Sequence, residues 1–114
     1  MTVQRLKIST DFSDTPGPRY IAEGPFSGEK FREDILYPKL KEVIDKNEKL
    51  VVDLDGTQGY GTSFLEESFG GLIRNNDLPI AVINQHIEVI SKEEPYLIND
   101  IEEYLNAAAD ESKK

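Results

Sequence analysis

An unbroken aliphatic run near the middle of the chain constrains the fold more than any other stretch. Leu50, Val51 and Val52 stand together in "LVVDLD", residues 50–55. Contiguous aliphatic residues over so short a span are typical of a strand buried on both faces. This pattern predicts a central strand, with the rest of the chain arranged as a sheet and covering helices around it.

The first half of the chain supplies two further predicted strands and a helix. "VQRLKIS", residues 3–9, alternates apolar and polar side chains, and "RYIAEG", residues 19–24, follows a Pro- and Gly-rich turn, so the two are predicted to form a loose hairpin. Ser27 is a predicted N-cap for a helix whose apolar face runs to Ile44. Pro38 lies inside that helix and predicts a kink or a break there.

The second half predicts helix, strand and helix. Ser63 and Glu66 fit a capping box at the start of the helix that follows the loop of residues 56–61, and Gly70 and Gly71 are predicted to let that helix approach the sheet. "IAVIN", residues 80–84, is a predicted strand, and the next residues are compatible with either a continuation or a turn. A second capping box, Ser91 to Glu94, is predicted to open the last helix.

Together these elements give the order β(β)–α–β–α–β–α, which predicts an α/β fold with a single mixed sheet and helices packed on it. With 114 residues the chain is the size of one domain. We expect that domain over residues 1–109 and a disordered C-terminal tail over residues 110–114.

Composition narrows the classes of function. The net charge of −9 disfavours nucleic acid and anionic membranes as partners, because both repel an acidic surface. The absence of Cys excludes disulfides and zinc–thiolate sites, and the single histidine, His86, leaves no His-rich metal site. With neither a signal peptide nor an apolar run of membrane-spanning length, the chain is expected to be cytoplasmic, with no metal and no cofactor.

The central strand runs into a motif that resembles the D-x-D-G-T signature of haloacid dehalogenase-like phosphatases, residues 53–57. In that family the first Asp attacks phosphorus and the second transfers protons beside Mg²⁺. The resemblance therefore implies a nucleophile at Asp53 and an acid/base at Asp55.

The remaining machinery of such a phosphatase is missing from the sequence. The next aliphatic run ends at Asn84 rather than at the Ser or Thr that the family needs. The acidic residues Asp100, Glu102 and Glu103 fall in a helical pattern rather than at a strand end. The phosphatase is thus the alternative prediction, and Asp53 and Asp55 are predicted instead to accept backbone N–H groups from the loop that follows.

A second likeness begins where the motif ends. The layout of this region resembles that of the STAS domain, the fold of anti-anti-sigma factors. It consists of an apolar strand that ends in Asp-Leu-x-Gly, a short loop, the pair Thr62-Ser63 and an amphipathic helix that contains Gly. The chain is closer still to a STAS-like family of unknown function. Three stretches carry that resemblance: "FSDTPGPRYIAEGPFSGEKFREDIL", "VVDLDGTQGYGTSFLEESFGGLIR" and "INDIEEYL".

The resemblance implies a site and a partner. In STAS domains the Ser or Thr just before the second helix is phosphorylated by a kinase of the histidine-kinase ATPase type. Thr62 takes that position here and Ser63 lies beside it, whereas Gly61 stands where those domains usually have Asp. The implied function is a non-enzymatic, bacterial-type signalling and protein-interaction module, whose partner is such an ATPase or an anti-sigma-like factor.

The loop itself supplies the predicted partner surface. Gly56, Gly59 and Gly61 are predicted to make positive-φ turns or to let a partner approach the following helix. Tyr60 is either an exposed anchor for that partner or a side chain that packs over the sheet edge. Thr62 is favoured over Ser63 for modification, because the capping box already accounts for Ser63.

Overall fold

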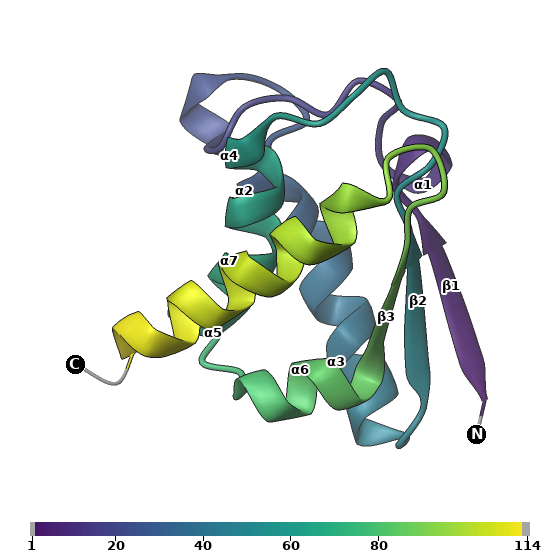
Figure 1. Cartoon of the computed structure of the whole chain (residues 1–114), viewed down its shortest axis with the longest axis vertical. Helices are drawn as coiled ribbons and strands as arrows, with labels where there is room; N and C mark the ends of the chain where they lie inside the picture. The colour runs from purple at the N-terminus through teal and green to yellow at the C-terminus, as the bar shows by residue number, and fades with distance from the viewer. Residues whose placement is uncertain (1, 113–114) are drawn as a thin grey trace.

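The structure, a computed structural model that describes residues 2–112, is built on a three-stranded parallel sheet (Figure 1). The strands are β1 (Val3–Lys7), β2 (Lys49–Asp53) and β3 (Ile87–Ile90), in the order β1-β2-β3. Leu6 pairs with Val52, and Val52 pairs with Val89. The α/β fold and the central place of the strand in "LVVDLD" are confirmed, but the sheet is parallel rather than mixed.

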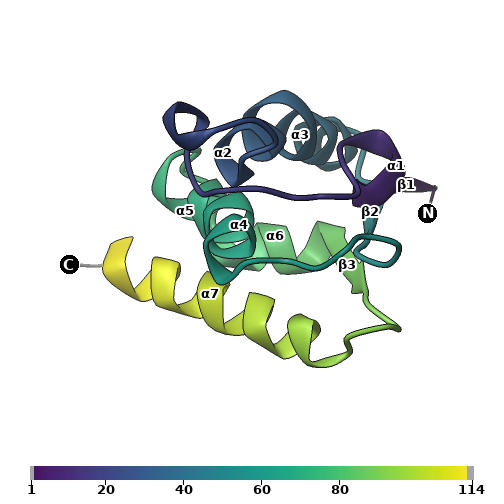
Figure 2. The same cartoon turned by 90° about the horizontal axis from the view of Figure 1, so that it is seen from above.

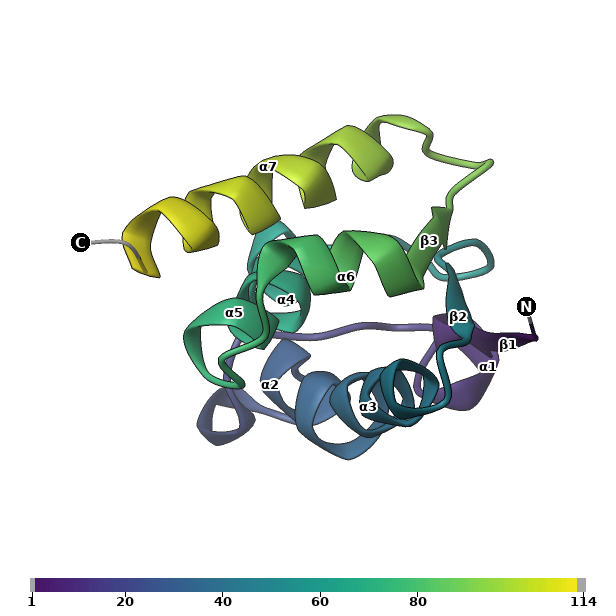
Figure 3. The same ribbon diagram turned by 90° about the horizontal axis from the view of Figure 1, so that it is seen from below.

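The sheet is parallel because the predicted hairpin does not form. Residues 19–24 contain only the short 3₁₀ helix η1 (Ile21–Glu23), and β1 leads instead into a single turn of helix, α1 (Ile8–Asp11). Each pair of neighbouring strands is then joined by a long helical crossover, which parallel strands require. Crossovers of one hand that step one way across a sheet put their helices on the same face. Figures 1 and 3 show all the larger helices on one side of the strands.

The first crossover is one continuous helical segment with a π-helical turn inside it. It runs through α2 (Gly28–Phe31), the π-helical η2 (Arg32–Leu36) and α3 (Tyr37–Asp45). The Ser27 hydroxyl accepts the N–H of Lys30 at 3.0 Å, which confirms the predicted N-cap. Pro38 does not break the helix; the chain forms the π turn just before it and continues directly as α3, with Pro38 in the first turn.

The second crossover holds a longer helical segment followed by a separate short helix. Residues 62–74 comprise α4 (Thr62–Leu65), the π-helical η3 (Glu66–Gly70) and α5 (Gly71–Arg74), and α6 (Ile80–His86) comes after a turn. The predicted strand over residues 80–84 is therefore wrong, because Pro79 caps a helix whose buried residues, Ile83 and His86, are three apart. A short aliphatic run does not distinguish a buried helix from a strand.

The last helix closes the helical layer. α7 (Tyr96–Ser112) runs along one side of the helical layer, beside α4 and α6, as Figure 2 shows from above, and buries Leu97, Ile101 and Leu105. Its start has no capping box: the Ser91 hydroxyl donates to the Glu94 carbonyl at 2.7 Å. Residues 110–112 are helical rather than part of a disordered tail, and residues 113 and 114 lie outside the described part of the chain.

The core lies between the sheet and the helices. It is formed by apolar side chains of the strands and of the two crossovers that have no exposed surface. They include Leu6, Leu50 and Val52 of the strands and Phe31, Leu40, Phe64 and Phe69 of the crossovers. Among residues 2–112 no helix is both long and apolar enough to cross a membrane.

Candidate functional site

The carboxyl ends of the three parallel strands meet at one end of the sheet, where open α/β sheets generally bind ligands (Figure 1). The connection from β2 to α4, residues 54–61, lies there beside α1 and the turn that leads from β3 to α7. We call residues 54–61 the crossover loop. It contains most of the residues that the sequence singles out, so its geometry decides what they can do.

Two of its three glycines have the predicted positive φ. Gly56 has φ +92° and packs so closely on α1 that a Cβ there would lie 2.8 Å from the Ser9 hydroxyl. Gly59 has φ +133° and faces open space. Gly61 has φ −77°, an ordinary extended conformation, and is also surrounded by open space, so the prediction of a positive-φ turn at Gly61 is wrong. The outer half of the loop is thus sterically open.

The two motif carboxylates are engaged with backbone N–H groups. Asp53 accepts the N–H of Asp55 at 2.9 Å. Asp55 accepts the N–H groups of Lys92 and Glu93 at 2.9 and 3.0 Å, and the Glu93 carboxylate in turn accepts the N–H of Gly56 at 2.7 Å. This reciprocal pair of contacts clasps the crossover loop to the turn after β3. Asp53 thus accepts an N–H from the following loop as predicted, whereas Asp55 has a structural role with a different partner, the turn after β3.

Removing the clasp is expected to destabilise the protein. Asp55→Ala leaves the N–H groups of Lys92 and Glu93 without their acceptor and should lower the free energy of unfolding by about 1–2 kcal/mol. Urea denaturation measures this change. Asp14→Ala is the matched control, since the exposed Asp14 contacts the same loop only through its backbone carbonyl, which accepts the N–H of Gln58 at 2.8 Å. Equal losses in the two variants would contradict the clasp.

Tyr60 packs inward rather than standing out as an anchor. It is half-buried against the core, its ring centroid lies 5.9 Å from that of Phe64, and its hydroxyl donates to the Leu54 carbonyl at 2.7 Å. Burial raises the pKa of Tyr60 above its ordinary value; the hydroxyl of Thr57 opposes this, and the negative charges of Asp53 and Asp55 add to it. Of the two alternatives for Tyr60, the structure therefore favours packing over the sheet edge.

The raised pKa of Tyr60 predicts a loss of stability in alkali. Above about pH 10 tyrosine ionises in the unfolded chain, while Tyr60 in the folded protein keeps its proton, so its stabilising contribution falls as the pH rises. At about pH 8, Tyr60→Phe should cost about 1 kcal/mol for the lost hydrogen bond. The stability gap between wild type and variant should then narrow at about pH 10.5, as measured by urea unfolding. A constant gap would contradict this prediction.

Thr62 and Ser63 are both exposed at the start of α4. The helix begins at Thr62 with Gly61 as N-cap and no side-chain cap, so the predicted capping box of Ser63 and Glu66 is wrong. Both hydroxyls therefore stand free of a capping role. Thr62 lies near Tyr104 of α7: burial raises the pKa of Tyr104, Asp100 adds to that, and the Thr62 hydroxyl opposes it.

Glu66 does not cap the helix because it belongs to a charge cluster that the sequence did not reveal. Its carboxylate is 2.5 Å from an Arg19 nitrogen and 2.6 Å from an Arg74 nitrogen. Burial alone would raise the pKa of Glu66, but the hydrogen bonds from Arg74 and Arg19 outweigh it and hold that pKa below its ordinary value. The cluster ties residue 19 to the helix that begins at Thr62.

The buried member of this cluster is the pair Arg32 and Glu67. One Arg32 Nη atom is 2.6 Å from Glu67 Oε2 and 2.9 Å from the Glu67 carbonyl oxygen, and both residues are almost fully buried. The other Nη atom of Arg32 is 3.3 Å from the carboxylate of the exposed Glu33. Gly71 was expected to approach the sheet, but it packs instead on the Arg32 guanidinium, which lies 2.2 Å from where a Cβ would be.

The further acidic residues that were weighed for a phosphatase site belong to the last helix. Asp100, Glu102 and Glu103 lie in α7, as their helical pattern indicates. Within residues 2–112 no group of three or more His, Asp or Glu side chains is arranged to hold a metal ion. His86 is buried, with Nδ1 2.6 Å from the Glu48 carbonyl oxygen, at the opposite end of β2.

Comparison with known proteins places the chain in a family. Residues 27–97, more than half of the sequence, match the STAS-like domain of unknown function (DUF4325). No curated protein and no solved structure matches the chain. The matched region includes β2, the crossover loop, Thr62 and the buried pair of Arg32 and Glu67. The chain therefore belongs to the family of STAS-like domains.

Proposed function

We propose that the chain is a non-enzymatic regulatory module that binds another protein through the outer half of the crossover loop and the start of α4. Phosphorylation of Thr62, or of Ser63 beside it, switches that binding. One observation carries the proposal: the two hydroxyls are exposed at the first two positions of a helix and neither caps it. Membership of a STAS-like family adds support.

A phosphate at this place would change the surface strongly. It adds about −1.5 to −2 charges and three acceptor oxygens. The helix N-terminus favours the added charge, whereas Glu66, one helical turn after Thr62, opposes it. The free and phosphorylated forms would thus present surfaces of different charge and shape, which is what a partner needs to distinguish them.

The outer residues of the crossover loop are open to a partner, while the inner residues are held to the strand ends by hydrogen bonds. Gly59 and Gly61 have no neighbour where a Cβ would stand, so a partner's backbone can approach closely. Beneath them, the Tyr60 hydroxyl and the clasp of Asp55 and Glu93 hold the loop to the strand ends. By family resemblance the partner is a histidine-kinase-type ATPase or an anti-sigma-like factor.

Site mapping tests the switch. The purified protein is incubated with ATP and an extract of the source cells, and phosphopeptides are identified by mass spectrometry. We expect phosphate on Thr62, with Ser63 as the secondary site, and no phosphate on the peptide in Thr62→Ala/Ser63→Ala. Phosphate on neither residue would remove the switch from the proposal.

A phosphatase assay tests the non-enzymatic character. The protein is mixed with Mg²⁺ and an aryl phosphate, and free phosphate is measured. We expect no release above the rate without protein, because the carboxylates of Asp53 and Asp55 are engaged with backbone N–H groups. Release that Asp53→Asn abolishes would contradict the proposal.

A further inference from the structure

A groove separates α6 from α7, on a different part of the molecule from the crossover loop. Figure 3 shows the two helices alongside one another, and three cavities of about 310, 230 and 100 Å³ lie along the space between them. Neighbouring cavities share wall residues, so they lie next to one another along the two helices. Ile80 lines the first two, and Leu105 lines the second and third.

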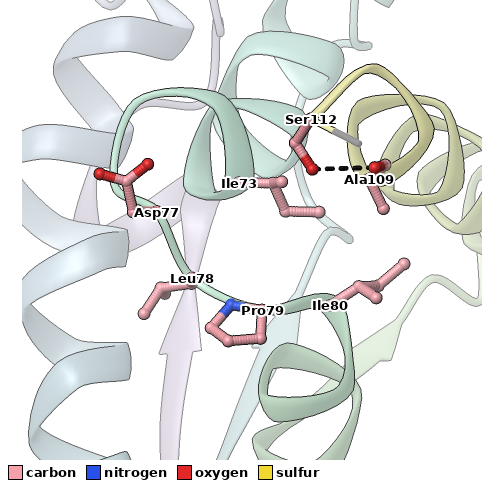
Figure 4. A pocket seen from close by; sticks show the side chains of 7 residues that line it. All are labelled: Ile73, Asp77, Leu78, Pro79, Ile80, Ala109 and Ser112. Carbon is pink, nitrogen blue, oxygen red and sulfur yellow. Dashed lines mark hydrogen bonds between the residues drawn. The ribbon is translucent and has the colours of Figure 1, made fainter. Parts of the chain in front are cut away.

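The two ends of the groove are apolar. The largest cavity lies between the turn before α6 and the end of α7, with Ile73, Leu78, Pro79 and Ala109 around it (Figure 4). The smallest lies at the other end, where Ile87 and Val89 of the edge strand β3 face Ile98 and Ile101. Each end can accept an apolar side chain of a partner.

The middle of the groove is polar and acidic. Asn84 of α6 and Asn106 of α7 line the central cavity together with Glu102, which also borders the smallest cavity. All three are exposed residues, so the groove is open to solvent along this stretch. Asp77 adds a second carboxylate on the rim of the largest cavity. A partner must therefore bring a positive charge between its two apolar anchors.

The charge of α7 selects the same kind of partner. Residues 96–112 contain five acidic residues and not one Lys or Arg. Charge complementarity thus favours a basic occupant and disfavours a second copy of this chain, whose net charge is −9. Anionic lipids and nucleic acids are repelled for the same reason.

The distance between the two apolar ends of the groove defines the spacing of side chains that a partner helix needs. Ile98 and Ala109, at the two apolar ends, are eleven positions apart on α7, which is about 16 Å or three helical turns. Glu102 stands between them, four positions after Ile98. A helix laid alongside α7 would match this pattern with apolar residues at i and i+11 and cations at i+4 and i+7, all on one face.

We propose that the groove between α6 and α7 binds a basic amphipathic helix of a partner protein. Two apolar side chains of that helix enter the end cavities, and a Lys or Arg between them pairs with Glu102. The residues that line the groove are not those of the crossover loop, so the protein would have two surfaces for partners.

A designed peptide tests the groove. The probe is a capped helical peptide of about 18 residues with Leu at i and i+11 and Lys at i+4 and i+7, the rest being Ala and Gln. Its binding to the folded, ¹⁵N-labelled protein is followed by NMR. We expect saturable shifts at Ile80, Asn84, Glu102 and Asn106 and none at Thr62. No saturable shift, or shifts centred on the crossover loop, would overturn the proposal.

Two charge-reversal variants distinguish a specific ion pair between Glu102 and the peptide from general electrostatic attraction of the peptide to α7. Glu102→Lys and Glu103→Lys make the same change at adjacent exposed residues, and of the two only Glu102 lines the groove. Glu102→Lys should weaken the peptide about tenfold or more and Glu103→Lys less than about threefold, while a peptide with Glu in place of Lys should regain affinity for Glu102→Lys. Equal weakening by both variants would overturn the proposal.

Analytical ultracentrifugation of the protein without peptide tests whether a second copy of the chain occupies the groove instead. We expect a monomer for wild type and for Glu102→Lys. Self-association of wild type that Glu102→Lys abolishes would assign the groove to a second copy and overturn the proposal of a basic helix.

Discussion

Arg32→Ala is expected to lower the free energy of unfolding by about 3–5 kcal/mol, the largest effect of any substitution considered in this protein. The guanidinium and the Glu67 carboxylate are both buried and lie 2.6 Å apart. Without Arg32, the charge of Glu67 keeps its desolvation cost and loses its closest counter-ion. Gly71 would also lose the group it packs on, which leaves a cavity.

Two variants distinguish burial from charge in this effect. Arg74→Ala removes a cation from the same cluster, but the Arg74 side chain is 29% exposed, so the expected loss is about 1 kcal/mol. Arg32→Met/Glu67→Met removes both buried charges and should recover a large part of what Arg32→Ala loses. Urea unfolding gives all the values on one scale. Equal losses for Arg32→Ala and Arg74→Ala would contradict a buried pair.

Gly28→Ala is expected to lower the free energy of unfolding by about 2–3 kcal/mol, although alanine is the better helix former. A Cβ at residue 28 would lie 2.5 Å from the backbone carbonyl oxygen of Phe64 and 3.1 Å from Cβ of Glu67. Backbone atoms cannot rotate away as a side chain can, so α2 and α4 must move apart. That movement would disturb the packing of Phe31 on Phe64, whose ring centroids are 5.7 Å apart.

Gly61→Ala is the matched control for Gly28→Ala. Its φ of −77° suits alanine, and nothing lies within 4 Å of the added Cβ. The expected change is less than about 1 kcal/mol, from the weaker N-cap alone. A loss at residue 28 no larger than that at residue 61 would contradict the close approach of the two helices.

Local chemistry was enough to predict several elements. The contiguous aliphatic residues of "LVVDLD" identified the central strand, and Ser27 identified the start of the first helix, since both signals depend on residues next to one another in the chain. The resemblance around Thr62 identified the family. The contact of the Asp53 carboxylate with the N–H of Asp55 was also predicted, because it spans only two residues. The contacts of Asp55 with Lys92 and Glu93 join residues 37 and 38 positions apart, so local sequence did not predict them.

The errors arose where distant contacts overrode a local signal. Ser63 and Glu66 have the spacing of a capping box, but Glu66 binds Arg19 and Arg74, so the helix begins without a side-chain cap. Residues 80–84 have the composition of a strand, yet the position next to β2 is occupied by Ile87–Ile90 and the run before it becomes α6. The partner of Arg32, thirty-five residues away, has no signature in the sequence.

We propose that the start of α4 is a partner surface whose binding is switched by charge at Thr62. The most direct test compares wild type, Thr62→Asp and Thr2→Asp as immobilised baits in an extract of the source cells, with retained proteins quantified by mass spectrometry. Thr2 is the matched control, an exposed threonine just before β1, at the other end of the sheet. We expect a partner that wild type and Thr2→Asp retain equally and Thr62→Asp loses about tenfold or more. Equal retention by all three baits, or no retained partner, would contradict it.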